Sequence, residues 1–188
     1  MSKQLMVYCG PMWSQKTSRM LLDVEKYKHA GREILAFKPK RDDRYAEEEI
    51  VTHMGWRFPA KGVSCGEEIS KHILAEAVNP SFCLVVVDEL FMIPGAADEL
   101  IWLHRNSSGV DIVVATLDLS YACKPFEEVI KILPWATRVE KYASACSVCG
   151  HDARFTYRKA EDEAEVLVGG KELYEPRCAL HHPFMEEE

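Results

Sequence analysis

Apolar positions along the chain fall into short unbroken runs and into stripes with helical spacing. Unbroken apolar runs predict strands covered on both faces, and they lie at 5–9, 33–37, 83–88 and 110–118, with one more strand expected at 138–142. Helical patterns lie at 17–30, 67–78, 96–105 and 125–133. Strands that alternate with helices predict an α/β fold in which a parallel sheet is flanked by helices.

Two stretches depart from this alternation. Residues 38–62 are polar and irregular, which predicts a long loop with room for one edge strand, and loops of that length are usually functional. After about residue 143 the pattern changes to paired cysteines, short β-like pieces and a Gly-Gly turn. We therefore expect an α/β domain over 1–142 and a small separate β module over 143–188.

Charge and composition narrow the function classes. The 188-residue chain has 23 Lys and Arg against 30 Asp and Glu, a net charge of −7, which disfavours nucleic acid as a partner. Its apolar runs are too short for a membrane helix, and its first residues lack a secretory signal, so we expect a cytoplasmic protein without a membrane partner. Seven cysteines in such a chain indicate buried thiols and a metal site.

The segment GPMWSQKTS, residues 10–18, almost matches the phosphate-binding loop G-x-x-x-x-G-K-[ST]. It lies between a predicted strand and a predicted helix, where backbone N–H groups can wrap an anion. Gln15 stands in place of the second glycine, whose positive φ costs a residue with a Cβ about 1–2 kcal/mol. Gln15 weakens this prediction without forbidding it. The alternative is an ordinary strand–turn–helix connection.

Two carboxylates, Asp88 and Glu89, end the apolar strand at 83–88. Ligands bind at the carboxyl end of parallel strands, where one carboxylate can support Mg²⁺ and a second can accept a proton from a hydroxyl. Two solvated carboxylates are the alternative, but the loop at 10–17 makes a matched pair with them. The run KPKRDDRY offers Asp42 and Arg44 to the same pocket, unless it is a solvated loop.

The strongest local chemical signal is the cysteine pattern. Cys146-x-x-Cys149 and Cys178-x-x-His181 supply three thiolates and one imidazole, a ligand set that suits tetrahedral zinc. His182 could replace His181, although the two-residue spacing favours His181. Because four protein ligands leave no open position, the zinc is expected to be structural.

Taken together, these motifs resemble the cytosolic-type thymidine kinase family, the class with a P-loop and a zinc site. The similarity extends from about residue 5 to residue 181, and its landmarks occur in order: GPMWSQKTS for the family's GPM-[FY]-S-G-K-[ST], FKPKRDDRY, VVVDE, TLDLSYACKPF, ACSVCG, ARFTYR, VGGKELY and C-x-x-H. The resemblance implies a P-loop (RecA-like) sheet over 1–142. It also implies a zinc-ribbon "lasso" over 143–188 that closes the nucleoside site.

The resemblance further implies transfer of the γ-phosphoryl group of ATP, with Mg²⁺, to the 5′-hydroxyl of thymidine, with deoxyuridine as a further candidate substrate. Glu89 would be the general base, and Thr17 and Asp88 would hold Mg²⁺. ATP phosphates would bind Gly10, Pro11, Met12, Trp13, Ser14, Gln15, Lys16, Thr17 and Arg44. The thymidine pocket would comprise Met12, Met92, Leu117, Tyr121, Phe126, Thr156, Val166, Val168, Gly169 and Tyr174. Family members are usually homotetramers and are often inhibited by dTTP.

Two departures from the family pattern leave alternatives open. Besides Gln15, the segment after Glu89 reads Leu-Phe-Met-Ile instead of G-Q-F-F or V-Q-F-F, so the family's glutamine is lost and Met92 replaces an aromatic residue. A methionine fills the same space with a softer contact, which could alter base preference. The alternative to an active kinase is a catalytically weakened homologue that binds nucleoside or nucleotide in a regulatory role. A third reading is a zinc-ribbon interaction module on an inert α/β domain.

Overall fold

The computed structural model describes residues 3–42, 48–76, 83–161 and 164–185. Its centre is a six-stranded sheet whose neighbouring strands all pair in parallel. The strand order is β5 (Lys61–Val63), β2 (Glu33–Pro39), β6 (Cys83–Val87), β7 (Asp111–Thr116), β1 (Leu5–Cys9) and β8 (Arg138–Lys141). The predicted parallel α/β sheet is thus confirmed.

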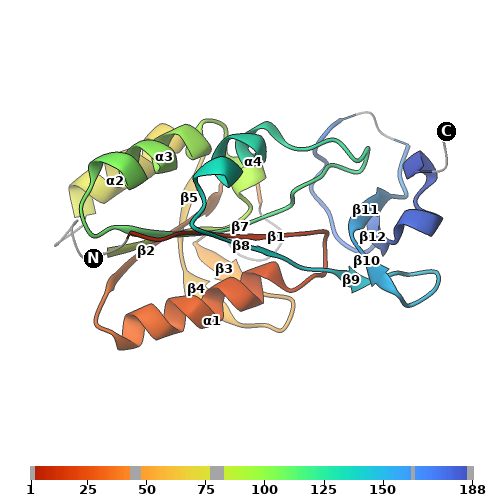
Figure 1. The fold of residues 1–188 in the computed structure, drawn as a ribbon, viewed down its shortest axis with the longest axis horizontal. Helices are drawn as coiled ribbons and strands as arrows, with labels where there is room; N and C mark the ends of the chain where they lie inside the picture. The colour runs from red at the N-terminus through yellow and green to blue at the C-terminus, as the bar shows by residue number, and fades with distance from the viewer. Residues whose placement is uncertain (1–2, 43–47, 77–82, 162–163, 186–188) are drawn as a thin grey trace.

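Helices cover both faces of this sheet (Figure 1). One face carries α1 (Lys16–His29), and the other carries α2 (Gly66–Glu76), α3 (Ala96–Asn106) and α4 (Glu127–Ile132). Their bounds lie within two residues of the predicted helices, except that 77–78 fall outside the described residues. The short 3-10 turn η3 (Leu133–Trp135) follows α4 directly.

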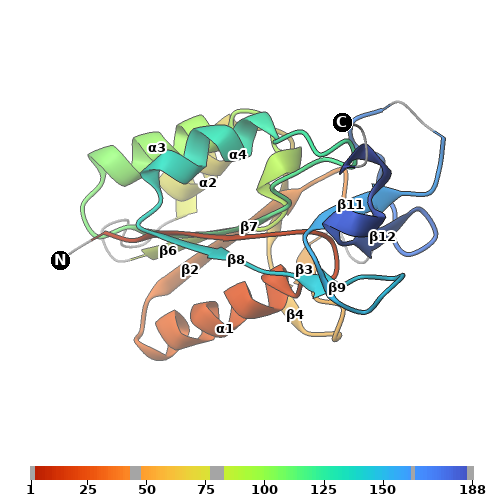
Figure 2. The same cartoon turned by 45° about the vertical axis from the view of Figure 1, so that its right-hand side comes forward.

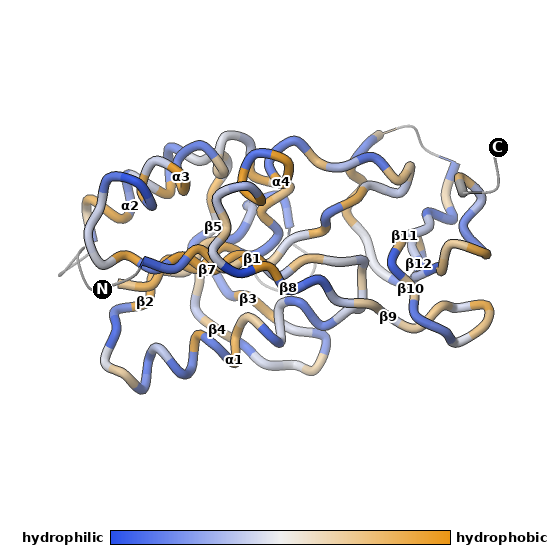
Figure 3. Tube along the Cα trace, viewed as in Figure 1, coloured by the Kyte–Doolittle hydropathy of each residue, from blue (hydrophilic) through white to orange (hydrophobic). Residues whose placement is uncertain are grey.

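Side chains of the inner strands β2, β6, β7 and β1 alternate between two apolar cores. Leu5 and Val7 of β1 pack in the core under α2, α3 and α4, whereas Met6 and Tyr8 pack in the core with α1. Every residue of β6 is buried, because this strand is covered on both faces. Figure 3 shows the apolar strands at the centre and polar segments along the outer helices.

The segment after β2 is more ordered than a long loop. Strands β3 (Glu49–Val51) and β4 (Arg57–Pro59) form an antiparallel hairpin, and β5 is an edge strand of the central sheet. The expected edge strand is confirmed. The prediction that the rest of 38–62 is a loop was wrong for the described residues, because they also form the hairpin β3–β4. Strands of three residues are too short to show alternation, and Ile50, which is fully buried, provides the hairpin's anchor.

The chain after 142 forms small antiparallel pairs beyond the carboxyl end of β1 (Figure 2). Strand β9 (Ser144–Ala145) pairs with β10 (Asp152–Ala153), and β11 (Phe155–Arg158) pairs with β12 (Tyr174–Arg177). The short turns η4 (Ala179–His181) and η5 (Pro183–Met185) follow. Among the described residues, no helix is long and apolar enough to cross a bilayer.

Candidate functional site

The loop between β1 and α1 has the backbone of a phosphate loop. Gly10 has φ of 138°, and a Cβ there would lie 2.4 Å from the carbonyl oxygen of Tyr142, so glycine is required. Gln15 has φ of 63° and ψ of 22°, the left-handed conformation expected for the missing glycine. Its side chain is exposed at the pocket rim. Gln15 therefore keeps the loop's shape at the cost of backbone strain.

Lys16 lies across this loop in a buried position. Its Nζ donates a hydrogen bond to the carbonyl oxygen of Pro11 at 2.7 Å, and the Ser14 hydroxyl donates to the same oxygen at 2.8 Å. Burial lowers the pKa of Lys16, and the charges of Glu89 and Asp88 oppose that shift. Together with the amino end of α1, the ammonium offers positive charge to an anion in the loop.

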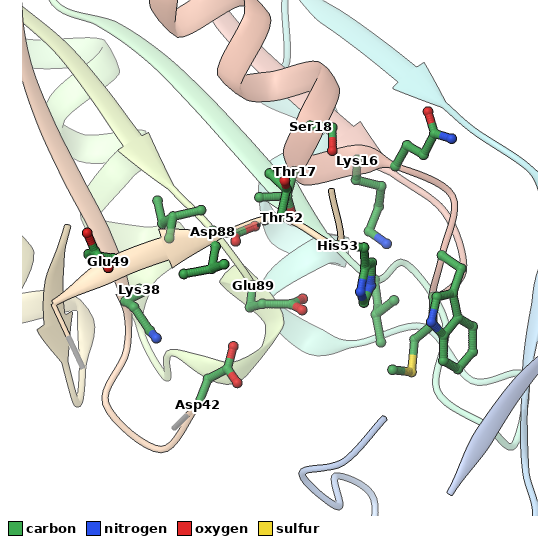
Figure 4. Close-up of a pocket in the computed structure, with 16 residues that line it drawn as sticks. Lys16, Thr17, Ser18, Lys38, Asp42, Glu49, Thr52, His53, Asp88 and Glu89 are labelled. Atoms are coloured by element: carbon green, nitrogen blue, oxygen red, sulfur yellow. Dashed lines mark hydrogen bonds between the residues drawn. The ribbon is translucent and has the colours of Figure 1, made fainter. Parts of the chain in front are cut away.

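Asp88 and Glu89 follow β6 and face this lysine (Figure 4). The Thr17 hydroxyl donates a hydrogen bond to Asp88, with 3.0 Å between Oγ1 and Oδ1. Burial, and then the neighbouring charge of Glu89, raise the pKa of Asp88 to about 7, while the Thr17 hydrogen bond opposes the rise. Glu89 has φ of 50°, an uncommon backbone conformation that clusters at functional sites.

These groups line one polar pocket, which we call the phosphate pocket. It contains Met12, Trp13, Gln15, Lys16, Thr17, Ser18, Lys38, Asp42, Glu49, Ile50, Val51, Thr52, His53, Asp88, Glu89 and Leu117. Asp42 lies where expected, while the predicted phosphate ligand Arg44 lies outside the described residues. Sequence reasoning missed Lys38 and the hairpin residues. Lys38 stood in the quoted run KPKRDDRY, but no motif marked the hairpin.

A second, more apolar pocket adjoins the first. All ten residues expected around the nucleoside line it: Met12, Met92, Leu117, Tyr121, Phe126, Thr156, Val166, Val168, Gly169 and Tyr174. Sequence reasoning missed Phe91, Leu119, Ser120, Arg158, Glu165 and Leu167, which also line it. Met12, Glu89 and Leu117 line both pockets, so the two pockets meet at these three residues. We call this second space the apolar pocket.

The segment after Glu89 brings an aromatic ring to the apolar pocket. It forms the 3-10 turn η2 (Leu90–Met92), in which Met92 is buried. Phe91 also lines the pocket, and its ring centre lies 4.5 Å from that of Phe126, with 38° between the planes. An aromatic side chain is therefore present beside Met92. Phe91 stood in the quoted run Leu-Phe-Met-Ile, but sequence reasoning assigned contact with the base only to Met92, the next residue.

Four expected zinc ligands converge near the chain end. The ligand atoms of Cys146, Cys149, Cys178 and His181 all lie within 4.8 Å of one another. Three thiol sulfurs and an imidazole at this spacing fit tetrahedral zinc. Burial would raise the pKa of Cys146, but backbone N–H bonds outweigh it and lower that pKa to about 6, which favours the thiolate.

His182, the alternative ligand, lies outside this cluster. It is fully buried, and one ring nitrogen is 3.4 Å from the carbonyl oxygen of Thr156. Another close polar neighbour is Cys123, whose sulfur is 3.6 Å from Nδ1. The Cys/His cluster therefore contains His181 and not His182, which agrees with the spacing.

A comparison with protein families agrees with this arrangement. The model of the family described as thymidine kinase matches residues 3–182, which include both pockets and the Cys/His cluster. A match over nearly the whole chain confirms the resemblance seen in the motifs. Members of such a family are kinases that use ATP and a nucleoside. The chain therefore belongs to the thymidine kinase family.

Proposed function

We propose that this protein transfers the γ-phosphoryl group of Mg-ATP to the 5′-hydroxyl of thymidine, giving thymidine monophosphate and ADP. One observation carries the proposal: Glu89 lines both pockets, so it stands where a nucleoside hydroxyl and a phosphate chain would meet. A carboxylate at that junction can accept the proton of the attacking hydroxyl. Deoxyuridine, which lacks only the base methyl group, is a further candidate substrate.

The phosphate pocket would hold the triphosphate. Backbone N–H groups of the loop 10–17 would bind the phosphates together with the Lys16 ammonium, except at Pro11, which has no N–H, and at Met12, whose N–H bonds to Thr156. Arg44 is proposed on the same side from the family motif. Thr17 and Asp88 fit Mg²⁺, because their hydroxyl and carboxylate oxygens are hard ligands only 3.0 Å apart. When bound, the ion neutralises charge on the transferring phosphoryl group.

The apolar pocket would hold the nucleoside. We propose that the base packs among Phe91, Met92 and Phe126, with the sugar directed toward Glu89. A nucleoside that fills this pocket would displace water from Glu89, so that the acceptor in the reaction is the nucleoside hydroxyl. Phosphoryl transfer depends mainly on positioning and electrostatics, which these two adjoining pockets supply.

The zinc site, the domain division and regulation complete the proposal. We propose that structural zinc at the Cys/His cluster holds a module over 143–188, which supplies the wall residues Thr156, Val166, Val168, Gly169 and Tyr174. dTTP combines the nucleoside thymidine with a triphosphate, so it would occupy both pockets at once and act as an inhibitor. A homotetramer is proposed from the family alone.

The test is ATP-dependent phosphorylation of thymidine, deoxyuridine and deoxycytidine by the purified protein. Glu89→Gln removes the proton acceptor and should lower turnover by about 10²–10⁴-fold. Thymidine affinity, measured by calorimetry, should stay near that of the wild type. A wild type without turnover on any of the three nucleosides would contradict the proposal.

Gln15 supports a second candidate, a homologue that binds nucleosides with little turnover. Its left-handed backbone is strained, which could misplace the N–H groups around a phosphate. Gln15→Gly removes that strain and distinguishes the two candidates. A silent wild type that binds thymidine and gains turnover in Gln15→Gly would favour the second candidate. An active wild type whose turnover changes little in Gln15→Gly would favour the active kinase.

A further inference from the structure

Arg158 is a buried cation beside the apolar pocket. It ends β11, its residue is 5% exposed, and it lines the pocket without lining the phosphate pocket. Its guanidinium carbon lies 3.8 Å from the ring centre of Tyr121, on the loop that follows β7. Burying a guanidinium costs several kcal/mol unless its hydrogen bonds are made by protein groups. The arrangement of its partners therefore indicates what this residue does.

The guanidinium binds the segment that forms the far wall of the pocket. Nη1 donates to the carbonyl oxygen of Ala164 at 2.5 Å, and Nη2 donates to that of Glu165 at 3.1 Å. Nη2 also donates to the Tyr174 hydroxyl at 2.9 Å. The two carbonyls stand at the start of the segment 164–169, of which residues 165–169 line the pocket. We call this segment the wall 164–169, and the two hydrogen bonds fix where it begins.

Tyr174 extends this network along the wall. Its hydroxyl donates to the carbonyl oxygen of Leu167 at 2.7 Å and accepts a bond from the Leu167 N–H at 3.3 Å. Arg158 and Tyr174 thus bind the backbone of this segment at three residues, Ala164, Glu165 and Leu167. The same guanidinium lies over the ring of Tyr121, which lines the pocket from the loop that follows β7.

We infer that Arg158 is a positioning residue, which sets the nucleoside-binding wall 164–169 relative to Tyr121 and so determines nucleoside affinity. The inference rests on the proposed function for its choice of ligand. Arg158 takes no part in phosphoryl transfer, since it does not line the pocket of Lys16 and Asp88. Only arginine presents a planar fork that serves two carbonyls and a hydroxyl while stacking on a ring.

Two substitutions separate charge from geometry. Arg158→Lys keeps the charge but loses the fork, and Arg158→Met keeps the chain length but loses every donor. Arg154→Met is the matched control, because Arg154 lies next to β11 and its side chain is half exposed. Within the part of the chain that the structure describes, its one ion-pair partner is Asp152 at 3.8 Å. Zinc content and melting temperature are measured for each protein to establish that it is folded.

Both Arg158 variants should raise the calorimetric Kd and the KM for thymidine about tenfold or more, as expected for a displaced binding wall. The KM for ATP should change less than about twofold, because neither Arg158 nor the segment 164–169 lines the phosphate pocket. Amide hydrogen exchange of 164–169 should accelerate in both variants, and Arg154→Met should match the wild type in every measurement.

Unchanged exchange at 164–169 in the folded Arg158 variants would overturn the inference, whatever the protein's activity. A thymidine Kd in Arg158→Lys equal to that of the wild type would also overturn it. An equal loss of ATP and thymidine binding in the Arg158 variants, together with loss of zinc, would overturn it as well. A wild type that neither binds nor phosphorylates thymidine would refute the proposed function instead. In that case the exchange experiment still decides whether Arg158 holds the wall.

Discussion

The backbone N–H of Met12 donates a hydrogen bond to the Thr156 hydroxyl, with 3.1 Å between N and Oγ1. Both residues are buried, and 144 positions of sequence separate them. This bond joins the phosphate loop to β11, so a direct hydrogen bond connects a residue that lines both pockets with the C-terminal segment. Movement of the C-terminal segment is therefore expected to alter the geometry of the phosphate loop.

Thr156→Val should weaken this link without changing side-chain volume much. The buried N–H of Met12 would lose its hydroxyl acceptor, at a cost of about 1–3 kcal/mol. We expect a higher KM for thymidine and for ATP together, since Met12 lines both pockets. Steady-state kinetics checks this, with Thr156→Ser as the control that keeps the hydroxyl. Equal KM values for the wild type and Thr156→Val would contradict it.

Zinc removal should disable nucleoside binding through the C-terminal segment. One zinc per chain is expected in the wild type by elemental analysis, and Cys149→Ser should bind far less because a thiolate ligand is lost. Thymidine affinity should fall in parallel. Cys65→Ser is the matched control, since Cys65 lies outside the Cys/His cluster. Wild-type zinc content in Cys149→Ser would refute the assigned ligand set.

Gln15→Gly should stabilise the folded protein. Gln15 has φ of 63°, where a residue with a Cβ is about 1–2 kcal/mol less favourable than glycine. Part of this gain is lost because glycine has more freedom in the unfolded chain, so an increase of about 1 kcal/mol in the free energy of unfolding is expected. Urea unfolding measures it. Glu25→Gly, within α1, should destabilise by about 1 kcal/mol instead.

Glu128 should stabilise the segment that leads from Asp88 and Glu89 into α3. Its carboxylate accepts hydrogen bonds from the backbone N–H groups of Gly95 at 2.9 Å and Ala97 at 2.8 Å. Glu128→Ala should lower the free energy of unfolding by about 1–3 kcal/mol, because buried donors at a helix start lose their acceptor. Glu127→Ala is the control, since the Glu127 side chain is exposed and, among the described residues, forms an ion pair only with Lys131. Equal stability of the two variants would contradict this role.

Two buried thiols should make stability depend on alkaline pH. Burial raises the pKa of Cys9 and of Cys83 from 9.0 to about 11 in the folded protein. Between these values the folded state binds more protons than the unfolded state, so the free energy of unfolding falls as pH rises from 9.0 toward 11. Urea unfolding across this range should show a shallower fall in Cys83→Ala than in the wild type. Cys65→Ala should follow the wild type.

Local sequence patterns predicted the central fold well. The apolar run CLVVV and its counterparts predicted buried parallel strands, because only strands covered on both faces are apolar throughout. The hairpin β3–β4 was missed because its strands have three residues each and lack a readable period. Motif spacing predicted the Cys/His cluster, because four ligands must be able to surround one ion.

The sequence by itself determined the chemistry that is available: a phosphate loop with Gln15, a carboxylate pair, and three cysteines with a histidine. The tertiary structure decided how these groups meet. It alone brought Lys38 and the hairpin into the phosphate pocket, placed Phe91 beside Phe126, and set Arg158 against the wall 164–169. These contacts join residues far apart in the chain, and no local period or spacing encodes them. Their positions follow only from the packing of the whole fold.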